Sequence, residues 1–367
     1  MKIGVPTEIK HDELRVGLTP AAVSELTRDG HEVTVQAGCG VGSGFNDAAY
    51  RQAGAHVVES AHAVFSTAEL IIKVKEPQAS ECDQLRAGQI LFTFLHLAAV
   101  PDLADHLLRS GATAIGYETV GSGRGELPLL APMSEVAGRL AVQAGCYHLE
   151  SVRGGRGVLL GGVPGVAPAN VVIIGGGVVG YQAARMAVGL GARVTVMDTS
   201  LPRLRQLDDV FRGAIDAVFA THDSMVRLAL SADLLIGAVL IPGASAPRLL
   251  ERDDILAMQP GSVVVDVAID QGGCFATSRP TTHEHPTYHV GETLHYCVAN
   301  IPSAVARTST LALSHATLPY VQALASGGLA ALKHDPWLAR GVNVHQGKIT
   351  HQAVAEALDK PYHESRW

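Results

Sequence analysis

Four charged or titratable residues lie where apolar segments of the chain end or where a helix is about to begin. Lys75, His96 and Asp270 each close an apolar run, and Arg15 precedes the helix-start signal Thr19-Pro20. In open α/β sheets, ligands bind outside the carboxyl ends of the strands. The four residues are therefore candidates for a ligand site. Taken singly, each also has an ordinary structural explanation as a salt-bridge partner, an exposed cap or a structural histidine.

Together these side chains suit the chemistry of a 2-amino acid. The guanidinium of Arg15 can bind a carboxylate through two parallel hydrogen bonds, and Lys75 can help to bind that carboxylate or polarise a developing carbonyl. Oxidative deamination passes through an iminium and a carbinolamine, so protons must move to and from nitrogen, oxygen and water. His96 is suited to that transfer, and Asp270 is suited to orienting or deprotonating the water.

A glycine-rich loop lies in the second half of the chain. Gly175, Gly177 and Gly180 form a GxGxxG pattern. A buried strand predicted over 171–174 precedes the loop, and a helix predicted over 181–190 follows it. In that context the glycines permit a tight turn, close approach of backbone amides to a pyrophosphate, and close packing of helix on strand. The pattern therefore predicts a dinucleotide site rather than an ordinary tight turn.

An acidic residue at the end of the next predicted strand indicates which dinucleotide binds. Asp198 follows the strand predicted over 193–197, where a carboxylate accepts hydrogen bonds from the adenine ribose hydroxyls. Its charge would repel a 2′-phosphate, so NAD is favoured over NADP. Arg203 and Arg205 leave the other option open, because a nearby arginine can accommodate that phosphate. A solvated helix face is the alternative explanation for both arginines.

Predicted strands alternate with predicted helices in two series along the chain. The first series of strands covers 2–5, 32–36, 56–58, 70–74, 90–95 and 113–117, and the second covers 171–174, 193–197, 217–219, 234–238, 263–267 and 297–298. Such alternation is typical of βαβ units in a parallel sheet. The second series is mostly Val, Ile and Leu, as expected for strands covered on both faces. These patterns predict an α/β fold with largely parallel sheets.

The helix signals complete this organisation. Helices are predicted from Thr19-Pro20 to Gly30 and from Pro101 to Gly111, with a capping or proline start and a glycine stop. A longer helix is predicted over 134–150, between the two series of strands. The glycine-rich stretch 154–165 after it is predicted to be a loop, either a connector or a functional segment. The tail returns to helical patterns at 303–325, 329–338 and 350–358.

Length and composition limit the class of protein. The 367 residues suffice for two domains, and 47% apolar with 17% charged residues is typical of a well-packed soluble protein. The net charge of -7 argues against a nucleic-acid partner. The scattered cysteines, without a CxxC pair, indicate reduced thiols in the cytoplasm. We expect neither a membrane span, which needs about 20 apolar residues, nor a secretory signal before the first strand.

A histidine-rich segment raises the question of a metal site. His283, Glu284, His285 and His289 lie close together in the sequence. Their spacing is not HExxH, and the segment is rich in Pro and Thr, which disfavours helical ligand geometry. We therefore expect a solvated loop and no bound metal.

With these motifs in place, the chain resembles the alanine dehydrogenase family and its relative, the nicotinamide nucleotide transhydrogenase. The resemblance covers essentially the whole chain and rests on 6–8, 13–16, 19–20, 73–77, 94–98, 131–135, 175–180 with Asp198, 267–270, 298–302, and Asn343 with Gly347-Lys348. It implies two Rossmann-like, doubly wound domains with parallel sheets. A discontinuous substrate domain, 1–130 and 303–367, would contain an inserted NAD-binding domain, 131–302.

The resemblance also implies roles for individual residues. Arg15 and Lys75 would bind pyruvate or alanine, and His96 and Asp270 would act in acid–base catalysis. NAD contacts are implied for the glycine loop and Asp198, and further for Ser134, Val178, Val179, Arg203, Val239, Leu240, Val267, Ala268, Ile269, Asp270, Val298, Ala299 and Asn300. Arg203 departs from the family pattern, which puts the adenine contact in doubt. We expect no magnesium site near the C-terminus of the kind known in some relatives, because Ala323 and Gly327 in that region offer no ligands.

The implied activity is NAD-dependent oxidative deamination of L-alanine to pyruvate and ammonium, and the reverse, by a cytoplasmic homohexamer. A second possibility is the nucleotide-binding module of a membrane transhydrogenase, which would not need the carboxylate-binding pair Arg15 and Lys75. A third is a non-catalytic NAD sensor, which would not need His96 and Asp270. A saccharopine-type dehydrogenase is a fourth, with a larger substrate.

Overall fold

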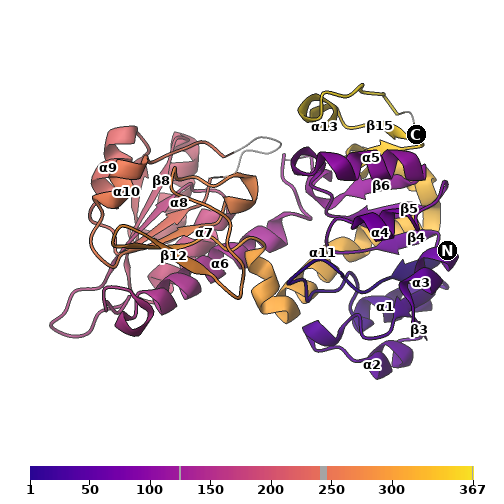
Figure 1. Cartoon of the computed structure of the whole chain (residues 1–367), viewed down its shortest axis with the longest axis horizontal. Coiled ribbons are helices and arrows are strands. Elements are labelled where there is room, and N and C mark those ends of the chain that lie inside the picture. The colour runs from indigo at the N-terminus through magenta and orange to yellow at the C-terminus, as the bar shows by residue number, and fades with distance from the viewer. Residues whose placement is uncertain (124, 240–245, 366) are drawn as a thin grey trace. The chain divides into compact units, whose positions relative to one another are not determined.

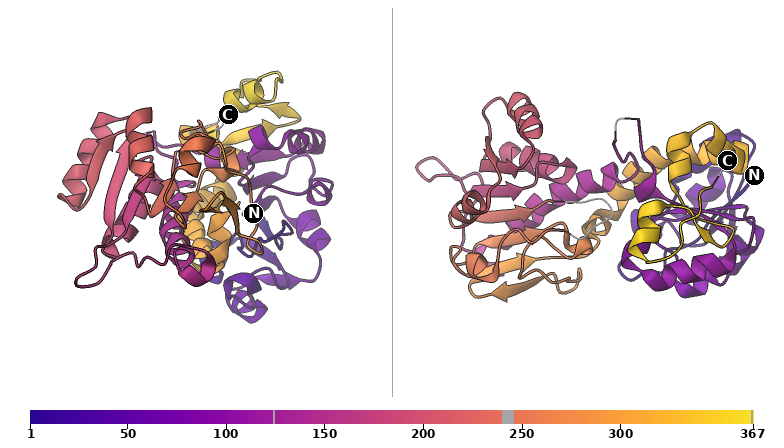
Figure 2. Two further views of the ribbon diagram at one scale, coloured as in Figure 1. Left: turned by 60° about the vertical axis from the view of Figure 1, so that its left-hand side comes forward. Right: turned by 90° about the horizontal axis from the view of Figure 1, so that it is seen from above.

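The computed structural model describes residues 1–123, 125–239, 246–365 and 367, and the chain divides into two compact units. Unit 1 comprises Met1–Met133 and Val305–Trp367, and unit 2 comprises Ser134–Ala304. Both chain termini belong to unit 1 (Figures 1 and 2), so the chain leaves unit 1 once and returns to it. Each unit is described below by itself.

The described part of unit 1 contains a sheet of eight strands in the order β15-β14-β6-β5-β4-β1-β2-β3. The strands β1 to β6 are parallel to one another, whereas β14 is antiparallel to β6 and β15 is antiparallel to β14. Their bounds are β1 Lys2–Val5, β2 Glu32–Gln36, β3 His56–Val58, β4 Leu70–Ile72, β5 Ile90–Thr93, β6 Thr113–Gly116, β14 Val342–His345 and β15 Lys348–Ile349. From β1 the chain builds outward to β3 and then returns to the other side of β1 with β4. The strand order therefore reverses between β1 and β4, which is where open sheets of this kind bind ligands.

Helices cover this sheet and connect its strands. They are α1 Pro20–Arg28, α2 Asp47–Gln52, α3 Ala61–Thr67, α4 Ala79–Cys82, α5 Pro101–Ser110, α11 Ala306–Gly327, α12 Pro336–Arg340 and α13 Gln352–Ala357, with short 3-10 segments η1 Val41–Ser43, η2 Leu97–Ala99, η3 Tyr117–Thr119 and η7 Gly328–Lys333. The caps explain where they begin: Thr19 accepts from the Ala22 amide before α1, and Pro101 starts α5. The long helix α11 returns from the far end of the sequence to pack beside N-terminal elements (Figure 1).

Unit 2 has a second doubly wound sheet in the order β12-β13-β11-β10-β7-β8-β9 within its described residues. Among the strands of unit 2 that the structure describes, only the edge strand β12 is antiparallel to its neighbour. The bounds are β7 Asn170–Ile174, β8 Arg193–Asp198, β9 Asp216–Phe219, β10 Leu234–Gly237, β11 Val263–Asp266, β12 Thr287–Val290 and β13 Thr293–Tyr296. Its strand order reverses between β7 and β10. Strands β10 and β11 are buried along their whole length, as the apolar sequence of this series predicts.

The helices of unit 2 complete the second Rossmann-like layer structure. They are α6 Ala131–His148, which begins in the last residues of unit 1, α7 Val178–Gly189, α8 Leu201–Phe211, α9 His222–Ala229 and α10 Arg252–Leu256, with 3-10 segments η4 Ser151–Arg153, η5 Ile269–Gln271 and η6 Ile301–Val305. The structure confirms the predicted α/β class with two mostly parallel sheets. Among the described residues, no helix combines the length and the apolar character that crossing a bilayer requires.

Some predicted elements differ from the structure in their bounds or their position. The strands predicted to end at Val74 and Leu95 stop at Ile72 and Thr93. A strand was predicted at 297–298, but the strand β13 lies just before it, where Thr293 and His295 are buried polar residues that mask the apolar pattern. The sequence also did not indicate β12, β14 or β15. The helix predicted over 329–338 is wrong in part, because η7 and α12 divide it at Asp335-Pro336.

Candidate active site

The carboxyl edge of the unit 1 sheet brings three of the predicted segments side by side. The amide of Phe94 donates to the carbonyl of Val74 at 3.2 Å, so the chain after β5 runs along the chain after β4. Gly17 lies against the end of β4, where an added Cβ would come within 2.9 Å of the Ile72 carbonyl oxygen. The segments that carry Arg15, Lys75 and His96 therefore meet at the edge where the strand order reverses.

Arg15 is held in place by Glu13. The Nε atom of Arg15 donates to Glu13 Oε1 at 2.7 Å, and Nη2 donates to Oε2 at 2.6 Å, which is a bidentate ion pair. Its third guanidinium nitrogen, Nη1, lies 3.0 Å from Sδ of Met133. Arg15 is only 2% exposed, so the direction of its side chain is fixed before any ligand binds.

Helix α11 anchors the segment that contains Arg15. Thr310 Oγ1 accepts a hydrogen bond from the Val16 amide at 3.2 Å, and Ser314 Oγ accepts one from the Thr19 amide at 3.3 Å. Ser43 donates to the Leu14 carbonyl at 2.9 Å. The sequence analysis did not single out these buried hydroxyls, because they lie 29 to 295 positions from the backbone groups that they contact and give no local signal.

The two lysines after β4 have different surroundings, and both are buried. Lys73 forms ion pairs with Glu8 at 2.9 Å and with Glu81 at 2.7 Å. Lys75 lies beside Glu76, which also forms an ion pair with Lys10. Burial opposes ionisation of Glu76, but Lys75 and Lys10 outweigh it, so the pKa of this carboxyl lies below its usual value. Lys75 thus belongs to a charged cluster at the sheet edge.

His96 follows β5 in an unusual backbone conformation, with φ 50° and ψ 36°. Its ring stacks on Phe94 with 5.6 Å between centroids, and its side chain is 33% exposed. The carboxylate of Glu118 accepts hydrogen bonds from the backbone amide of His96 at 2.7 Å and from that of Leu95 at 3.1 Å. A half-exposed imidazole beside buried charges is suited to proton transfer with a ligand at this edge.

The glycine loop of unit 2 has the geometry that a dinucleotide requires. Gly175 has φ 105°, and an added Cβ would come within 2.6 Å of the Ala238 carbonyl oxygen. A Cβ on Gly180 would clash with the Gly175 carbonyl oxygen, so the third glycine permits the close packing of α7. A Cβ on Gly177, by contrast, would meet open space among the described residues. Gly177 caps α7 without a side chain, and Val178 and Val179 begin the helix, so its first turn is open to an anion.

Asp198 and Arg203 both contact the glycine loop. Asp198 Oδ2 accepts a hydrogen bond from the Gly176 amide at 2.8 Å, and Arg203 Nε donates to the Gly176 carbonyl at 2.6 Å. The Arg203 guanidinium also lies 5.7 Å from the centre of the Tyr181 ring. Arg203 is thus not simply part of a solvated helix face, because it is oriented toward the loop.

The predicted cofactor residues after β11 are held by a buried carboxylate. Asp266 accepts hydrogen bonds from the Cys274 amide at 2.7 Å, the Ala268 amide at 3.1 Å and Ser278 Oγ at 2.5 Å. Burial raises the pKa of Asp266, although these hydrogen bonds oppose the shift. Asp266 fixes the turn that carries Val267, Ala268, Ile269 and Asp270, and Asp270 itself is exposed.

The remaining predicted contacts fall mostly at the same carboxyl edge. Val239 follows β10, whereas Leu240 lies outside the described residues. Val298, Ala299 and Asn300 follow β13, and Asn300 has φ 62°. Ser134 lies separately, in the first turn of α6. The residues present therefore fit a dinucleotide: a glycine cradle, an open helix start and an acidic residue at the end of β8.

The histidine-rich segment has a structural role that the sequence did not indicate. His283 is half-buried, with Nε2 2.9 Å from Ser303 Oγ and 3.4 Å from the Asn300 carbonyl oxygen. His289 lies in strand β12, so the prediction of a solvated loop is wrong for that residue. Within the described ranges, no group of three or more His, Cys, Asp or Glu side chains is arranged to bind a metal ion.

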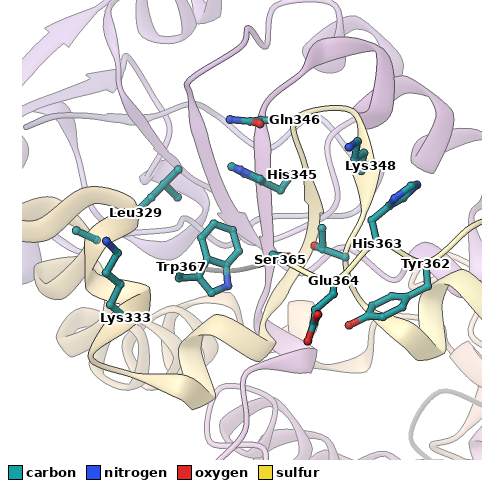
Figure 3. Close-up of a pocket in the computed structure, with 12 residues that line it drawn as sticks. Leu329, Lys333, His345, Gln346, Lys348, Tyr362, His363, Glu364, Ser365 and Trp367 are labelled. Atoms are coloured by element: carbon teal, nitrogen blue, oxygen red, sulfur yellow. The ribbon is translucent and has the colours of Figure 1, made fainter.

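A cavity of about 730 Å³ opens elsewhere in unit 1, between η7, the β14–β15 hairpin and the C-terminal tail. Lys333, Lys348, His345 and His363 are among its lining residues (Figure 3). In Figure 3, Lys333 lies across the cavity from Lys348 and His363, so the two amines do not converge on one anion. None of the predicted catalytic or binding residues lines this cavity, and the candidate site remains at the sheet edges.

Comparisons with known proteins cover both units of the chain. The family models described as "Alanine dehydrogenase/PNT, N-terminal domain" and "Alanine dehydrogenase/PNT, C-terminal domain" match residues 4–137 and 141–352. Alanine dehydrogenases from Halomonas elongata and Mycobacterium tuberculosis (strain H37Rv) are 59% and 55% identical to this chain. The alignment with the Halomonas protein covers 100% of this chain and 99% of that relative. The alignment with the Mycobacterium protein covers 99% of this chain and 98% of that relative.

Two solved structures show the same relationship in three dimensions. One named L-alanine dehydrogenase superimposes with a TM-score of 0.94 at 50% identity, over 98% of this chain and 99% of that chain. A transhydrogenase from Sinorhizobium meliloti superimposes with a TM-score of 0.82 at 25% identity, over 96% and 100%. The similarity is therefore full-length in both sequence and fold, and it is stronger to the first structure than to the second.

Proposed function

The chain belongs to the alanine dehydrogenase/PNT family, and from this premise we propose that it oxidises L-alanine to pyruvate and ammonium with NAD, and catalyses the reverse reaction. Its activity is that of an alanine dehydrogenase, an oxidoreductase that acts on small molecules with a nicotinamide nucleotide. The observation that carries the residue assignments is the meeting of the segments of Arg15, Lys75 and His96 at one sheet edge. In this proposal unit 1 binds the substrate and unit 2 binds the dinucleotide.

Arg15 and Lys75 are proposed to bind the substrate carboxylate. A guanidinium carries five N–H donors, so Arg15 can serve Glu13 and a substrate carboxylate at the same time. Lys75 adds a second positive charge at the same edge, where Glu76 and Lys10 already form a charged cluster. Because both cations are buried, their attraction for a carboxylate is screened less than it would be at the surface.

His96 and Asp270 are proposed to move the protons. A bound nicotinamide would supply the acceptor for the hydride that leaves Cα of alanine. The substrate amine then becomes an iminium, and addition of water at the same carbon gives a carbinolamine that loses ammonia to form pyruvate. His96 accepts and returns the protons of the attacking water and the leaving nitrogen, and Asp270 orients that water. The exposure of both residues is compatible with contact to a substrate.

NAD rather than NADP is proposed because of Asp198. Replacement of Asp198 by alanine is expected to weaken NAD binding and to relax the preference for NAD, because the carboxylate that accepts from the ribose hydroxyls and repels a 2′-phosphate is lost. Arg203, beside the same loop, would then face the phosphate. The measurement is kcat/KM with each dinucleotide, and Asp216→Ala, at the start of β9, serves as the control. An unchanged preference would remove Asp198 from the ribose site.

The direct test of the activity is a substrate panel. NAD reduction is followed at alkaline pH with a set of L-amino acids, and NADH oxidation is then followed with pyruvate plus ammonium. We expect the highest turnover with L-alanine and a reverse reaction that depends on ammonium. Dinucleotide binding without turnover of any amino acid would instead favour hydride exchange between nucleotides, as in a transhydrogenase.

Location and assembly are part of the same proposal. We propose a cytoplasmic enzyme, and its five free cysteines suit a reducing compartment. The homohexamer implied by the family resemblance is proposed as its assembly. Sedimentation of the full chain measures that assembly, and a monomer would contradict it.

A further inference from the structure

The backbone of the proposed acid–base residue needs support from its surroundings. The backbone of His96 lies in the left-handed region. Non-glycine residues adopt this region at a cost in conformational free energy and remain in it only where surrounding contacts stabilise it. Leu95, just before it, is fully buried, whereas the imidazole is partly exposed. The turn at Leu95-His96 therefore directs the ring toward the sheet edge, and its conformation decides where the ring lies.

The carboxylate of Glu118 provides that support. Oε1 accepts from the amides of His96 at 2.7 Å and Leu95 at 3.1 Å, and Oε2 accepts from the Leu95 amide at 3.2 Å. The same Oε1 lies 3.9 Å from Nδ1 of the His96 ring. One negative charge thus binds two consecutive amides of the turn and faces the imidazole.

Glu118 is itself placed by a rigid support. It lies in η3, directly after β6, next to Tyr117. Tyr117 is fully buried, donates from its hydroxyl to the Lys73 carbonyl at 3.0 Å, and packs edge-on against Phe92 and Phe94. Because Tyr117 is held by these contacts, Glu118 has little freedom to follow the turn if the turn shifts.

Other charged groups face this pair from neighbouring elements. On the His96 side, Glu76 lies within electrostatic range, together with its partners Lys75 and Lys10. On the Glu118 side, His351 approaches from the start of α13; burial lowers its pKa, and Glu118 opposes that shift. The Glu118 carboxylate is therefore one of several charged groups near the imidazole. Unlike Glu76, it also accepts hydrogen bonds from the backbone of the turn.

We propose that Glu118 is the positioning residue of the acid–base histidine, fixing the left-handed turn at Leu95-His96 and keeping a negative charge beside the ring. This inference rests on the proposed role of His96. Glu118 acts through His96 and needs no contact with the substrate. It holds the imidazole in place for proton transfer through the hydrogen bonds to the backbone of the turn.

Two substitutions separate the hydrogen bonds from the charge. Glu118→Ala removes both. We expect kcat to fall about a hundredfold, because displacement of a reacting group by about 1 Å lowers the rate by that factor. The KM for L-alanine and the affinity for NADH should change little. Glu118→Gln keeps an acceptor of the same size but no charge. We expect it to retain more of kcat than Glu118→Ala does, because the amides of the turn keep an acceptor. Glu59→Gln, at an exposed site after β3, is the matched control.

Two further measurements distinguish this proposal from a general structural role and from failure of the proposed function. Hydrogen exchange of the peptide covering 94–100 should become faster in Glu118→Ala and remain slower in Glu118→Gln. In a His96→Ala background, Glu118→Ala should lower kcat little further, because it acts through His96. Unchanged exchange, or full additivity of the two substitutions, would overturn the proposal. Full activity of His96→Ala would instead overturn the assigned role of His96, while the exchange rates would still decide whether Glu118 fixes the turn.

Discussion

Replacing His96 by alanine is expected to lower kcat for L-alanine oxidation by about 10²–10⁴-fold, the usual contribution of a positioned general acid–base group. The proton acceptor is removed, but the cations proposed to bind the carboxylate remain. Dinucleotide affinity, measured by NADH fluorescence, should stay the same, because the predicted dinucleotide contacts belong to unit 2 and His96 belongs to unit 1. A loss confined to kcat would identify His96 with the chemical step.

The control for this experiment is another half-buried histidine of the same unit. The side chain of His106 in α5 is 29% exposed, against 33% for His96, and it also lies near a carboxylate, that of Asp83. His106→Ala should therefore show what loss of such a ring costs in stability alone. If His96→Ala retains turnover close to that of His106→Ala, the acid–base assignment is wrong. Asp270→Ala should lower turnover by a comparable factor, because the group proposed to orient the water is lost. That carboxylate is exposed and contributes little to the core, so stability should be kept.

The central strands of both sheets could be predicted from the sequence, because parallel strands buried on two faces appear as uninterrupted apolar runs. The same property explains the errors in strand ends. Val74 and Leu95 are fully buried although the hydrogen-bonded strands have already ended, so an apolar pattern cannot locate the last strand residue. Strand β13 was missed for the opposite reason. Its buried His295 pairs through Nε2 with Thr277 Oγ1 at 2.8 Å, a contact that a local pattern does not contain.

The candidate site was predictable only in part. His96 and Lys75 were singled out because they follow predicted strands, and Glu118 follows the strand predicted over 113–117 by the same rule, yet it was not considered. Glu13 gave no signal, because a pair two residues apart has many possible geometries, and only the fold shows its bidentate contact with Arg15. Strand order decides which residues meet at the edge, and strand order cannot be predicted from any one segment of the sequence.

Lys73 illustrates how neighbouring residues of one type can have different roles. It lies two positions before Lys75, yet it is completely buried and its ammonium is paired with Glu8 and Glu81. Glu8 also accepts from the Val74 amide at 2.6 Å, so this network fixes the chain at the exit of β4. Two carboxylates surround one ammonium, and removal of the ammonium would leave their charges uncompensated in the interior.

Lys73→Met is therefore expected to lower the free energy of unfolding of unit 1 by about 3–5 kcal/mol, the usual cost of removing one partner from a buried ion pair. Both tryptophans, Trp337 and Trp367, lie in unit 1, so denaturant titration followed by tryptophan fluorescence reports that unit. Lys2→Met, at the exposed start of β1, is the control and should cost little. The triple variant Glu8→Gln, Lys73→Met, Glu81→Gln should recover part of the loss, since it leaves no charge in this buried network.

The pH dependence of the single variant provides an independent check. Burial already raises the pKa of Glu8 above its ordinary value of 4.5, although Lys73 opposes the shift. A group whose pKa is raised by folding stabilises the folded state below its unfolded pKa, and that contribution is lost as the pH rises through the folded pKa. Without Lys73 the shift grows, so the difference between Lys73→Met and the unsubstituted protein should be larger at pH 7 than at pH 5. A difference that is constant with pH would mean that the buried carboxylates find another partner, and that packing rather than charge determines the cost at this position.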